Sequence, residues 1–483
     1  MRCFSSAGRV SSSSSAPAAP ATAAVPIRRQ RMPPSSAFVA SASSPSGPQL
    51  AAPARGVSAG GKRRLISVPA SIERSSQSAL GAMKAMAATS STSLLRSVVV
   101  NASTPSPSAS SSIVETLGLA SPEVEAAISE ALDNCLVDTD LEIPGARVCV
   151  GKVRDTYLLD DEPGETKTSS PPPSSPPPSS PPPPRRPLAV LVTTDRLSAF
   201  DRRIAAIPFK GQVLNETSAW WMRNTGHIVP NALLATPDPC VSVMRRCRVF
   251  PVEFVVRGFL TGSTDTSLWT HYNRGEREYC GNSFPDGMTK NQRLAANVVT
   301  PTTKADDHDE PITPAEIVAR GLMTQEQWDE TAAAALKLFE FGQERASERG
   351  LLLVDTKYEF GLDLSRDGSD KEGRITLIDE IHTPDSSRYW ISESYERRLG
   401  EGKEPESIDK EFIRLWFRDR CDPYKDEALP EAPRELRAEL SRRYVSLFEK
   451  ITGEKFKPAD SKVPARERMR ANVAKCLEEI QKK

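Results

Sequence analysis

The chain has 483 residues, with 63 basic and 63 acidic side chains, and this length suits one large or two ordinary domains. No Asp or Glu precedes Glu73, so residues 73–483 carry 54 basic against 63 acidic residues, a net charge of −9. A mildly acidic body argues against a nucleic-acid-binding protein, which would normally present a basic face. No apolar run approaches the roughly 18 residues of a membrane-spanning helix, so we expect no membrane partner either.

The first 110 residues are rich in Ser, Ala, Pro and Arg and contain nine basic residues before Glu73. This composition is typical of an organellar transit peptide, and it lacks the apolar core of a secretory signal. We therefore expect residues 1–110 to be a transit peptide and disordered tail, with the plastid stroma as destination and the mitochondrion as the alternative. An ordinary disordered tail without a targeting role is the other interpretation.

Eight cysteines are scattered along the chain without any C-x-x-C pair, and the four histidines do not cluster with them. This pattern predicts reduced thiols and no structural zinc site.

Residues 113–136 have apolar side chains at helical spacing and predict an amphipathic helix. The segment Arg147–Leu159 then predicts two strands joined by a tight turn at Gly151 and Lys152. Such a turn can place backbone N–H groups against phosphates, with Lys152 as a point charge. The P-loop pattern is absent, so an ordinary hairpin is the alternative for this segment alone.

Residues 160–187 contain repeated PPPSS blocks between two strand-like runs, the second being Leu188–Thr194. Proline-rich, low-complexity sequence cannot pack a core. We interpret it as an insertion at a hairpin tip, where extra length costs little. A ligand for a proline-recognition domain is the alternative.

The segment Thr194–Asp201 predicts a loop after a buried strand, and this loop places Asp195, Ser198 and Asp201 where substrate-contacting groups often lie. Residues 214–223 predict a helix whose two tryptophans pack in the core.

A strand is expected over Ser242–Val249, followed by the apolar run Phe250–Ser263. Pro251 lacks an N–H, so it should interrupt the ladder there, as a hinge between lobes would. Glu253 and Arg257 are charges within this apolar run, and such residues are seldom buried unless they are paired, which favours a cleft. The turn at Gly262 and Ser263 suits an anionic ligand.

Residues 297–310 form a polar loop that carries Lys304 and His308; a plain solvated loop is the alternative. Two capping boxes, beginning at Thr313 and Thr324, open helices, and the second should run to about Arg349. The region from residue 409 onward predicts amphipathic helices with charged faces and shows no chemistry of its own.

The segment Leu353–Gly361, LVDTKYEFG, predicts a strand with Asp355, Lys357 and Glu359 on one face, because alternate side chains of a strand share a face. A second strand over residues 375–381 would pair with it and bring Asp379 close to Glu359. Two carboxylates together with substrate phosphates are a common Mg²⁺ site. The alternative is an exposed hairpin whose charges only pair with one another.

Six motifs then occur in the order found in one family. The runs FPVEFVVRGFLTGS (250–263) and LVDTKYEFG (353–361) resemble the two signature segments of SAICAR synthetase, phosphoribosylaminoimidazole-succinocarboxamide synthase. The runs GKVRD (151–155), TDRLSAFD (194–201), TPTTKADDHDE (300–310) and DEIHTPDSSR (379–388) are similar to family motifs as well. The resemblance covers roughly residues 147–457.

The resemblance implies an α+β, two-lobed fold with nucleotide between the lobes. The smaller, β-rich lobe would comprise residues 111–249, with the proline-rich insertion, and the larger α+β catalytic lobe residues 250–483. The implied activity is ATP-dependent joining of the carboxylate of carboxyaminoimidazole ribotide (CAIR) to the amine of L-aspartate, giving SAICAR, ADP and phosphate in de novo purine synthesis. The alternatives are a small-molecule kinase on a related fold and a non-catalytic scaffold, and the oligomeric state stays open, a homo-oligomer included.

Site residues follow from the resemblance in four groups. The residues implied for the ATP site are Gly151, Lys152, Val249 and Glu253. The implied Mg²⁺ ligands are Glu359 and Asp379. The residues implied for CAIR are Arg257, Ser263, Asp355, Asp385, Ser387 and Arg388. Those implied at the reacting centre are Lys357, Lys304 and Asp201. No residue is implied for gripping L-aspartate, and His308 is a candidate base only by its pKa range.

Overall fold

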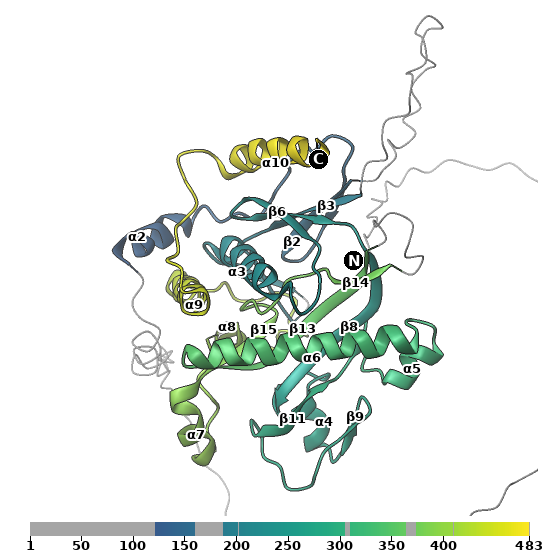
Figure 1. Cartoon of the computed structure of the whole chain (residues 1–483). Coiled ribbons are helices and arrows are strands. Elements are labelled where there is room, and N and C mark those ends of the chain that lie inside the picture. The colour runs from purple at the N-terminus through teal and green to yellow at the C-terminus, as the bar shows by residue number, and fades with distance from the viewer. Residues whose placement is uncertain are drawn as a thin grey trace, which may run out of the picture. The chain divides into compact units, whose positions relative to one another are not determined.

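The structure is a computed structural model that describes residues 121–159, 187–200, 202–304, 310–363, 373–408 and 410–482 (Figure 1). The predicted transit peptide, the interior of the proline-rich insertion, Asp201 and His308 lie outside these residues. Among the helices of the described part, none is long and apolar enough to cross a membrane.

The first sheet is antiparallel and holds five strands in the order β1-β2-β3-β7-β6. Its strands are β1 (Arg147–Val150), β2 (Arg154–Leu159), β3 (Leu188–Thr193), β6 (Leu233–Asp238) and β7 (Val241–Arg245). Leu159 pairs with Leu188 across β2 and β3, so the insertion connects two neighbouring strands, as the sequence predicted. A short separate hairpin follows β3 and consists of β4 (Arg196–Ala199) and β5 (Arg202–Ala206).

The second sheet is built on two long antiparallel strands, β8 (Arg248–Phe259) and β13 (Leu351–Asp363). Its order is β11-β8-β13-β14, and β12 and β15 pair with β8 and β13. The shorter strands are β11 (Arg293–Val299), β12 (Thr302–Thr303), β14 (Arg374–Leu377) and β15 (Ser387–Ile391). A small two-stranded sheet pairs β9 (Glu278–Tyr279) with β10 (Asn282–Ser283).

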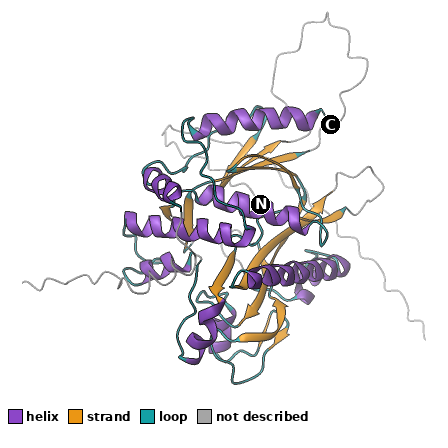
Figure 2. Cartoon of the chain, turned by 60° about the vertical axis from the view of Figure 1, so that its left-hand side comes forward, coloured by secondary structure: helices purple, strands orange, loops and turns teal. Residues whose placement is uncertain are grey.

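Helices cover both sheets (Figure 1). α6 (Gln325–Glu348) lies along β13 and β8, and α10 (Ala465–Gln481) lies against β6 of the first sheet. Figure 2 shows α10, the helix at the C-terminal end, running along the strands of the first sheet. The other helices are α2 (Pro122–Ala131), α3 (Lys210–Thr225), α4 (Leu268–Asn273), α5 (Pro314–Ala319), α7 (Ser392–Gly400), α8 (Glu411–Arg418) and α9 (Arg434–Thr452).

The main core lies between α3, α6 and the second sheet. Trp221 of α3 is fully buried there, while Trp220 is half-buried, so the prediction of core tryptophans holds fully for Trp221. Phe254 of β8 stacks on Trp328 of α6 with ring centroids 5.2 Å apart. Because this face of β8 and β13 is filled by apolar packing, the charged side chains must point to the opposite face.

The mixed α+β fold is confirmed, and five local predictions need correction. The strand predicted over Ser242–Val249 is divided between β7 and β8, which belong to different sheets. The helix predicted over 113–136 is described only as α2 and ends at Ala131, and residues 194–201 enter a short hairpin where a loop was expected. The strand predicted over 375–381 ends at Leu377, after which the chain bends at Asp379. β8 continues through Pro251, whose missing N–H falls at a register shift against β13.

Cysteine chemistry differs from expectation at one residue. Six described cysteines are free thiols, as the sequence predicted: Cys135, Cys240, Cys247, Cys280, Cys421 and Cys476. Cys149 is disulfide-bonded, so the expectation that all the thiols are reduced is wrong at this residue.

Candidate active site

The face of the second sheet away from α6 carries a row of charged side chains. On β13 the row consists of Asp355, Lys357 and Glu359, as the alternation predicted. The antiparallel register places Glu359 opposite Glu253 and Asp355 opposite Arg257, so β8 extends the row sideways. Buried strand charges of this kind are stable only when they are paired, and here they are.

At one end of the row, Glu359 and Asp379 meet as predicted. The backbone N–H of Ile378 donates to the carbonyl of Glu359 at 3.0 Å, which holds the bend after β14 against β13. Lys304 forms an ion pair with Glu359. Arg154 of β2 forms a two-pronged pair with Asp379, with Nη2 2.8 Å from Oδ2.

These pairs fix the charge states at this end of the row. Burial alone would raise the pKa of Asp379, but Arg154 and Lys304 outweigh it and hold that pKa well below its usual range. Burial alone would lower the pKa of Lys357, but the carboxylates of Glu253, at 2.7 Å, and Glu359 outweigh it and raise that pKa. Asp379 is therefore an anion and Lys357 a cation at neutral pH.

The chemistry of the donors fits Mg²⁺ bound together with phosphate. Glu359 and Asp379 supply hard carboxylate oxygens. Mg²⁺ is usually coordinated by one or two protein carboxylates, and phosphate and water oxygens complete its octahedral coordination. Within the described residues, no group of three or more His, Cys, Asp or Glu could hold a metal ion. An ion at this pair would therefore depend on ligands from the phosphates of a bound nucleotide.

A cavity of about 480 Å³ opens between the two sheets beside this carboxylate pair. Its apolar walls come from both sheets and include Leu158, Leu191, Met244, Val249 and Ile378. Glu359 and Asp379 line its charged end. Three arginines, Arg147, Arg245 and Arg246, also line the cavity. Apolar walls combined with cationic and anionic side chains suit a heterocycle that carries phosphates. Gly151, Lys152 and Glu253 are not among its lining residues.

The turn between β1 and β2 is so tight that any side chain at position 151 would collide with the backbone, and Gly151 has none. A Cβ there would lie 2.5 Å from the carbonyl oxygen of Arg154, and the N–H of Gly151 donates to that oxygen at 2.8 Å. Arg196 and Arg203 of the β4–β5 hairpin both donate to the carbonyl of Gly151, at 3.2 and 2.8 Å. Arg196 is itself held by Asp155 at 2.6 Å in a buried pair. The hairpin thus braces the turn.

At the other end of the row, Asp355 accepts from two arginines on neighbouring strands. Arg388 of β15 and Arg257 of β8, the latter at 3.5 Å, both contact Asp355 Oδ2. Arg257 also donates to the hydroxyl of Thr300 at 2.8 Å. Burial lowers the pKa of Arg257, although Asp355 opposes this. Two guanidinium groups therefore lie together on β8 and β15, and guanidinium groups are the side chains that bind phosphate with paired hydrogen bonds.

Three predicted residues lie apart from this arginine pair. The hydroxyl of Ser387 hydrogen-bonds that of Thr356 at 2.7 Å, on the opposite face of β13. Asp385 is buried against Lys210 at 3.0 Å and accepts from the hydroxyl of Tyr444 at 2.8 Å. Burial alone would raise the pKa of Asp385, but Lys210 holds it well below its usual range. Ser263 lines a second pocket, together with residues of α8.

Comparison with protein families is decisive here. A family model described as SAICAR synthetase matches residues 185–431, more than half of the chain. The chain belongs to the SAICAR synthetase family. The match spans the second sheet, β3, β6 and β7 of the first sheet, and every predicted site residue except Gly151 and Lys152.

Relatives within the family are similar over most of their length. The chain is 54% identical over 343 residues to a phosphoribosylaminoimidazole-succinocarboxamide synthase of Legionella pneumophila, covering 71% of this chain and 99% of the relative. It is 53% identical over 353 residues to an Arabidopsis thaliana protein of that name marked chloroplastic, covering 72% of this chain and 78% of the relative. The solved SAICAR synthase of Saccharomyces cerevisiae, in complex with SAICAR, is similar with a TM-score of 0.52 and 26% identity, over 67% of this chain and 99% of the yeast chain.

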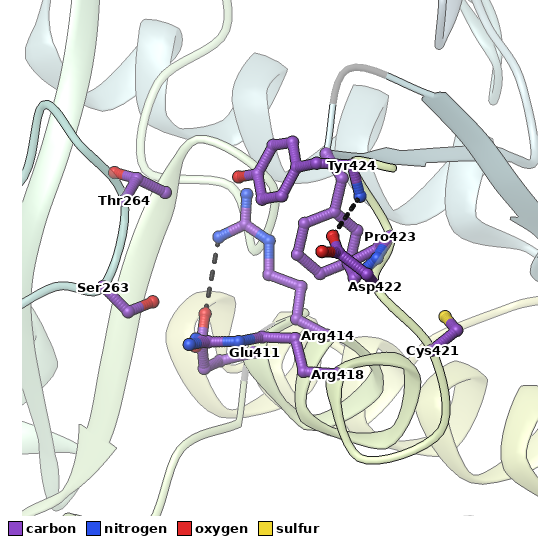
Figure 3. Close-up of a pocket in the computed structure, with 10 residues that line it drawn as sticks. Ser263, Thr264, Glu411, Arg414, Arg418, Cys421, Asp422, Pro423 and Tyr424 are labelled. Carbon is purple, nitrogen blue, oxygen red and sulfur yellow. Dashed lines mark hydrogen bonds and ion pairs between the residues drawn. The ribbon is translucent and has the colours of Figure 1, made fainter. Parts of the chain in front are cut away.

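A second pocket of this SAICAR synthetase family member, about 390 Å³ in volume, lies at α8 (Figure 3). It joins Ser263 and Thr264 to Arg414 and Arg418 of α8 and to Phe200 of the β4–β5 hairpin. Sequence reasoning missed both of these arginines because α8 reads as an amphipathic helix with a charged face. It also missed Arg154 and Arg196, although both stand inside the quoted motifs.

Proposed function

We infer that this chain is an ATP-dependent C–N ligase that joins the carboxylate of CAIR to the amine of L-aspartate, giving SAICAR, ADP and phosphate in de novo purine synthesis. Family membership and 54% identity to a synthase whose length the match covers almost fully carry this conclusion. The relatives give no support to the kinase alternative.

We assign ATP to the cavity between the sheets. Its apolar walls suit the adenine ring, with Val249 beside the base. The braced turn at Gly151 and Lys152 would approach the phosphates, and Glu253 would act through Lys357, to which it is paired at 2.7 Å. The proposed lobe boundary near residue 249 is supported by the change of sheet between Arg245 and Arg248. α10 packs on the first sheet and therefore belongs with the N-terminal lobe in this division.

Glu359 and Asp379 would hold Mg²⁺ at the phosphate end of this cavity. When bound, the ion would neutralise charge on the transferring phosphoryl group. Lys304 and Arg154, which neutralise the two carboxylates here, would exchange part of that contact for phosphate oxygens. Such exchange keeps the cluster close to neutral with or without nucleotide.

The two ends of the charged row on β13 would serve different parts of the ligase reaction. Phosphoryl transfer to the CAIR carboxylate would occur at the Lys357–Glu359 end, where Lys357 and Lys304 stabilise negative charge. The amine of L-aspartate would then displace phosphate from the acyl phosphate. Arg257 and Arg388 would take the ribotide phosphate, and Asp355, which both arginines contact, would position them. Ser263 and Asp201 are proposed substrate contacts, whereas Ser387 and Asp385 would support the loop that carries Arg388.

The plastid is the proposed location, within it the stroma. Two plant relatives, from Arabidopsis thaliana and Vigna aconitifolia, are named chloroplastic, and the acid-free N-terminal composition agrees with this. Deleting residues 1–95 from a reporter fusion should abolish import. Import of the truncated fusion would contradict a targeting role.

Product formation tests the proposed function directly. The full chain with Mg-ATP and CAIR should release ADP only when L-aspartate is present, and the succinocarboxamide should be detected by mass. ADP release that ignores L-aspartate would restore the kinase interpretation.

A further inference from the structure

Three segments far apart in the sequence enclose the pocket at α8. Phe200 comes from the β4–β5 hairpin, Ser263 and Thr264 follow β8, and the remaining wall is α8 with the turn after it. Figure 3 shows the side chains of Arg414 and Arg418 projecting from α8 into the space in front of Ser263 and Thr264.

The two arginines share one face of α8, because residues four apart on a helix are neighbours. Arg414 is 22% exposed at its side chain and contacts Glu411 at 3.4 Å. Arg418 is exposed and has no ion pair with any residue that the structure describes. The other acid in the wall, Asp422, is occupied by its own turn, since it accepts from the backbone of Tyr424 at 3.2 Å and pairs with Lys425 at 3.0 Å. The pocket therefore offers uncompensated positive charge.

Its remaining lining gives the pocket shape and hydrogen-bonding groups. The ring of Tyr424 meets Phe200 edge to face with centroids 5.4 Å apart. Phe200 has a φ of 54°, a left-handed conformation that a bulky residue adopts only at a cost. The Phe200 ring lines the pocket, where Ser263 and Thr264 supply hydroxyl groups.

The pocket adjoins the arginine pair assigned to the ribotide. Ser263 lies six residues after Arg257 on one continuous segment. On the other side, the N–H of Ile408, three residues before α8, donates to the carbonyl of Tyr389 at 3.2 Å, next to Arg388. The two arginines proposed for the ribotide therefore lie on segments that lead toward the pocket, which itself contains two further arginines.

Charge matching identifies the ligand. CAIR carries one phosphate, for which Arg257 and Arg388 suffice, and ATP has the cavity between the sheets. L-Aspartate has two carboxylates and no assigned partner, and the α8 pocket presents two guanidinium groups one helical turn apart. Guanidinium groups bind carboxylates with paired hydrogen bonds. We propose that Arg414 and Arg418 form the subsite that holds the two carboxylates of L-aspartate. This proposal rests on the ligase function inferred above.

Steady-state kinetics of single variants test the proposal. Arg418→Gln and Arg414→Gln remove one cation each, and Arg420→Gln is a matched control, because Arg420 stacks on Trp416 at 4.5 Å and does not line the pocket. Each pocket variant should raise the KM for L-aspartate by about tenfold or more, as expected on losing a charged hydrogen bond. The KM values for CAIR and ATP should stay within about twofold, and the control should match wild type in all three.

Succinate gives a second readout that involves no chemistry. This dicarboxylate lacks the nucleophilic amine, so it should inhibit wild type competitively against L-aspartate, and inhibition should weaken by about tenfold in both pocket variants. Arg418 is exposed, so Arg418→Gln should fold even if Arg414→Gln does not.

The other outcomes overturn the proposal in distinguishable ways. A rise in the KM for CAIR instead of L-aspartate would mean that the pocket holds the ribotide phosphate. Unchanged constants in both variants would mean that the arginines are ordinary surface charges. If the proposed function itself were wrong, wild type would already turn over without L-aspartate, before any variant is compared.

Discussion

The cavity between the sheets and the pocket at α8 treat charge in opposite ways. In the cavity region, Asp379 and Glu359 are each matched by a cation from another segment. In the α8 pocket, Arg418 has no ion partner among the described residues. Buried ion pairs contribute to the stability of the fold, and a bound ligand can replace one partner of each pair. An exposed arginine without an ion pair contributes little to stability and can bind an anion directly. The difference predicts how each region responds to substitution.

Asp379→Asn should have the largest effect. Loss of the carboxylate weakens the proposed metal site, and we expect kcat/KM to fall about a thousandfold, equivalent to about 4 kcal/mol. The variant leaves the mostly buried Arg154 facing a neutral amide, so we expect a loss of about 2 kcal/mol in the free energy of unfolding. Turnover and urea unfolding measure both, with exposed Asp329→Asn as control. Turnover of the Asp379→Asn variant at the wild-type rate would rule out Asp379 as a metal ligand.

Asp155→Asn should damage stability more than activity. It leaves buried Arg196 without its charged partner, and the free energy of unfolding should fall by about 3 kcal/mol. Because Arg196 braces Gly151, the KM for ATP should also rise. The control is Asp133→Asn, which breaks an exposed pair with Arg434 that solvent screens, so its effect on stability should be far smaller. Equal losses from both variants would show that the brace is unimportant.

Glu216→Gln should stabilise the protein in one pH range. Burial raises the pKa of Glu216 to about 7 from its ordinary 4.5. Between those values the native state keeps a proton that the unfolded state releases, so stability falls as pH rises from about 4.5 to 7. The variant should therefore gain about 1 kcal/mol over wild type at pH 8 and nothing at pH 4. Parallel denaturant titrations at the two pH values measure this difference, and a pH-independent gain would contradict the assigned cause.

Arg418→Gln should change stability least. With no ion pair among the described residues, its removal should alter the free energy of unfolding by less than about 0.5 kcal/mol. Thermal melting of this variant should be compared with that of Arg196→Gln, whose free energy of unfolding should fall by several kcal/mol. The difference between the two variants measures the contrast between the two regions. A large loss at Arg418 would assign it a structural role instead of a binding one.

The sequence predicted those parts of the site that lie on regular strands. Alternation along β13 was sufficient to place Asp355, Lys357 and Glu359 on one face, because the period of a strand is fixed. The capping boxes at Thr313 and Thr324 likewise located α5 and α6, and both boxes form in the structure. These signals are local and need no knowledge of the fold.

What the sequence did not predict depends on contacts between distant segments. Arg154 pairs with a residue 225 positions away. Arg418 and Ser263 line one pocket although they are far apart in the sequence, and the segment before α8 pairs with β15 through Ser407 and Trp390. No periodicity reports such a meeting. The ends of elements were missed for a related reason: β14 stops at Leu377 because the next residues turn Asp379 toward Arg154, a tertiary contact.

The pairing of Leu159 with Leu188 has a consequence for how this gene can vary. The connection between β2 and β3 begins and ends on directly opposed residues, a gap that a two-residue hairpin turn also closes. Each doubling of the connection's length adds only about 0.6 kcal/mol of closure cost. The gene can therefore gain or lose PPPSS-coding repeats without altering the register of the sheet. Length differences at this position between related genes would carry no information about catalytic capacity.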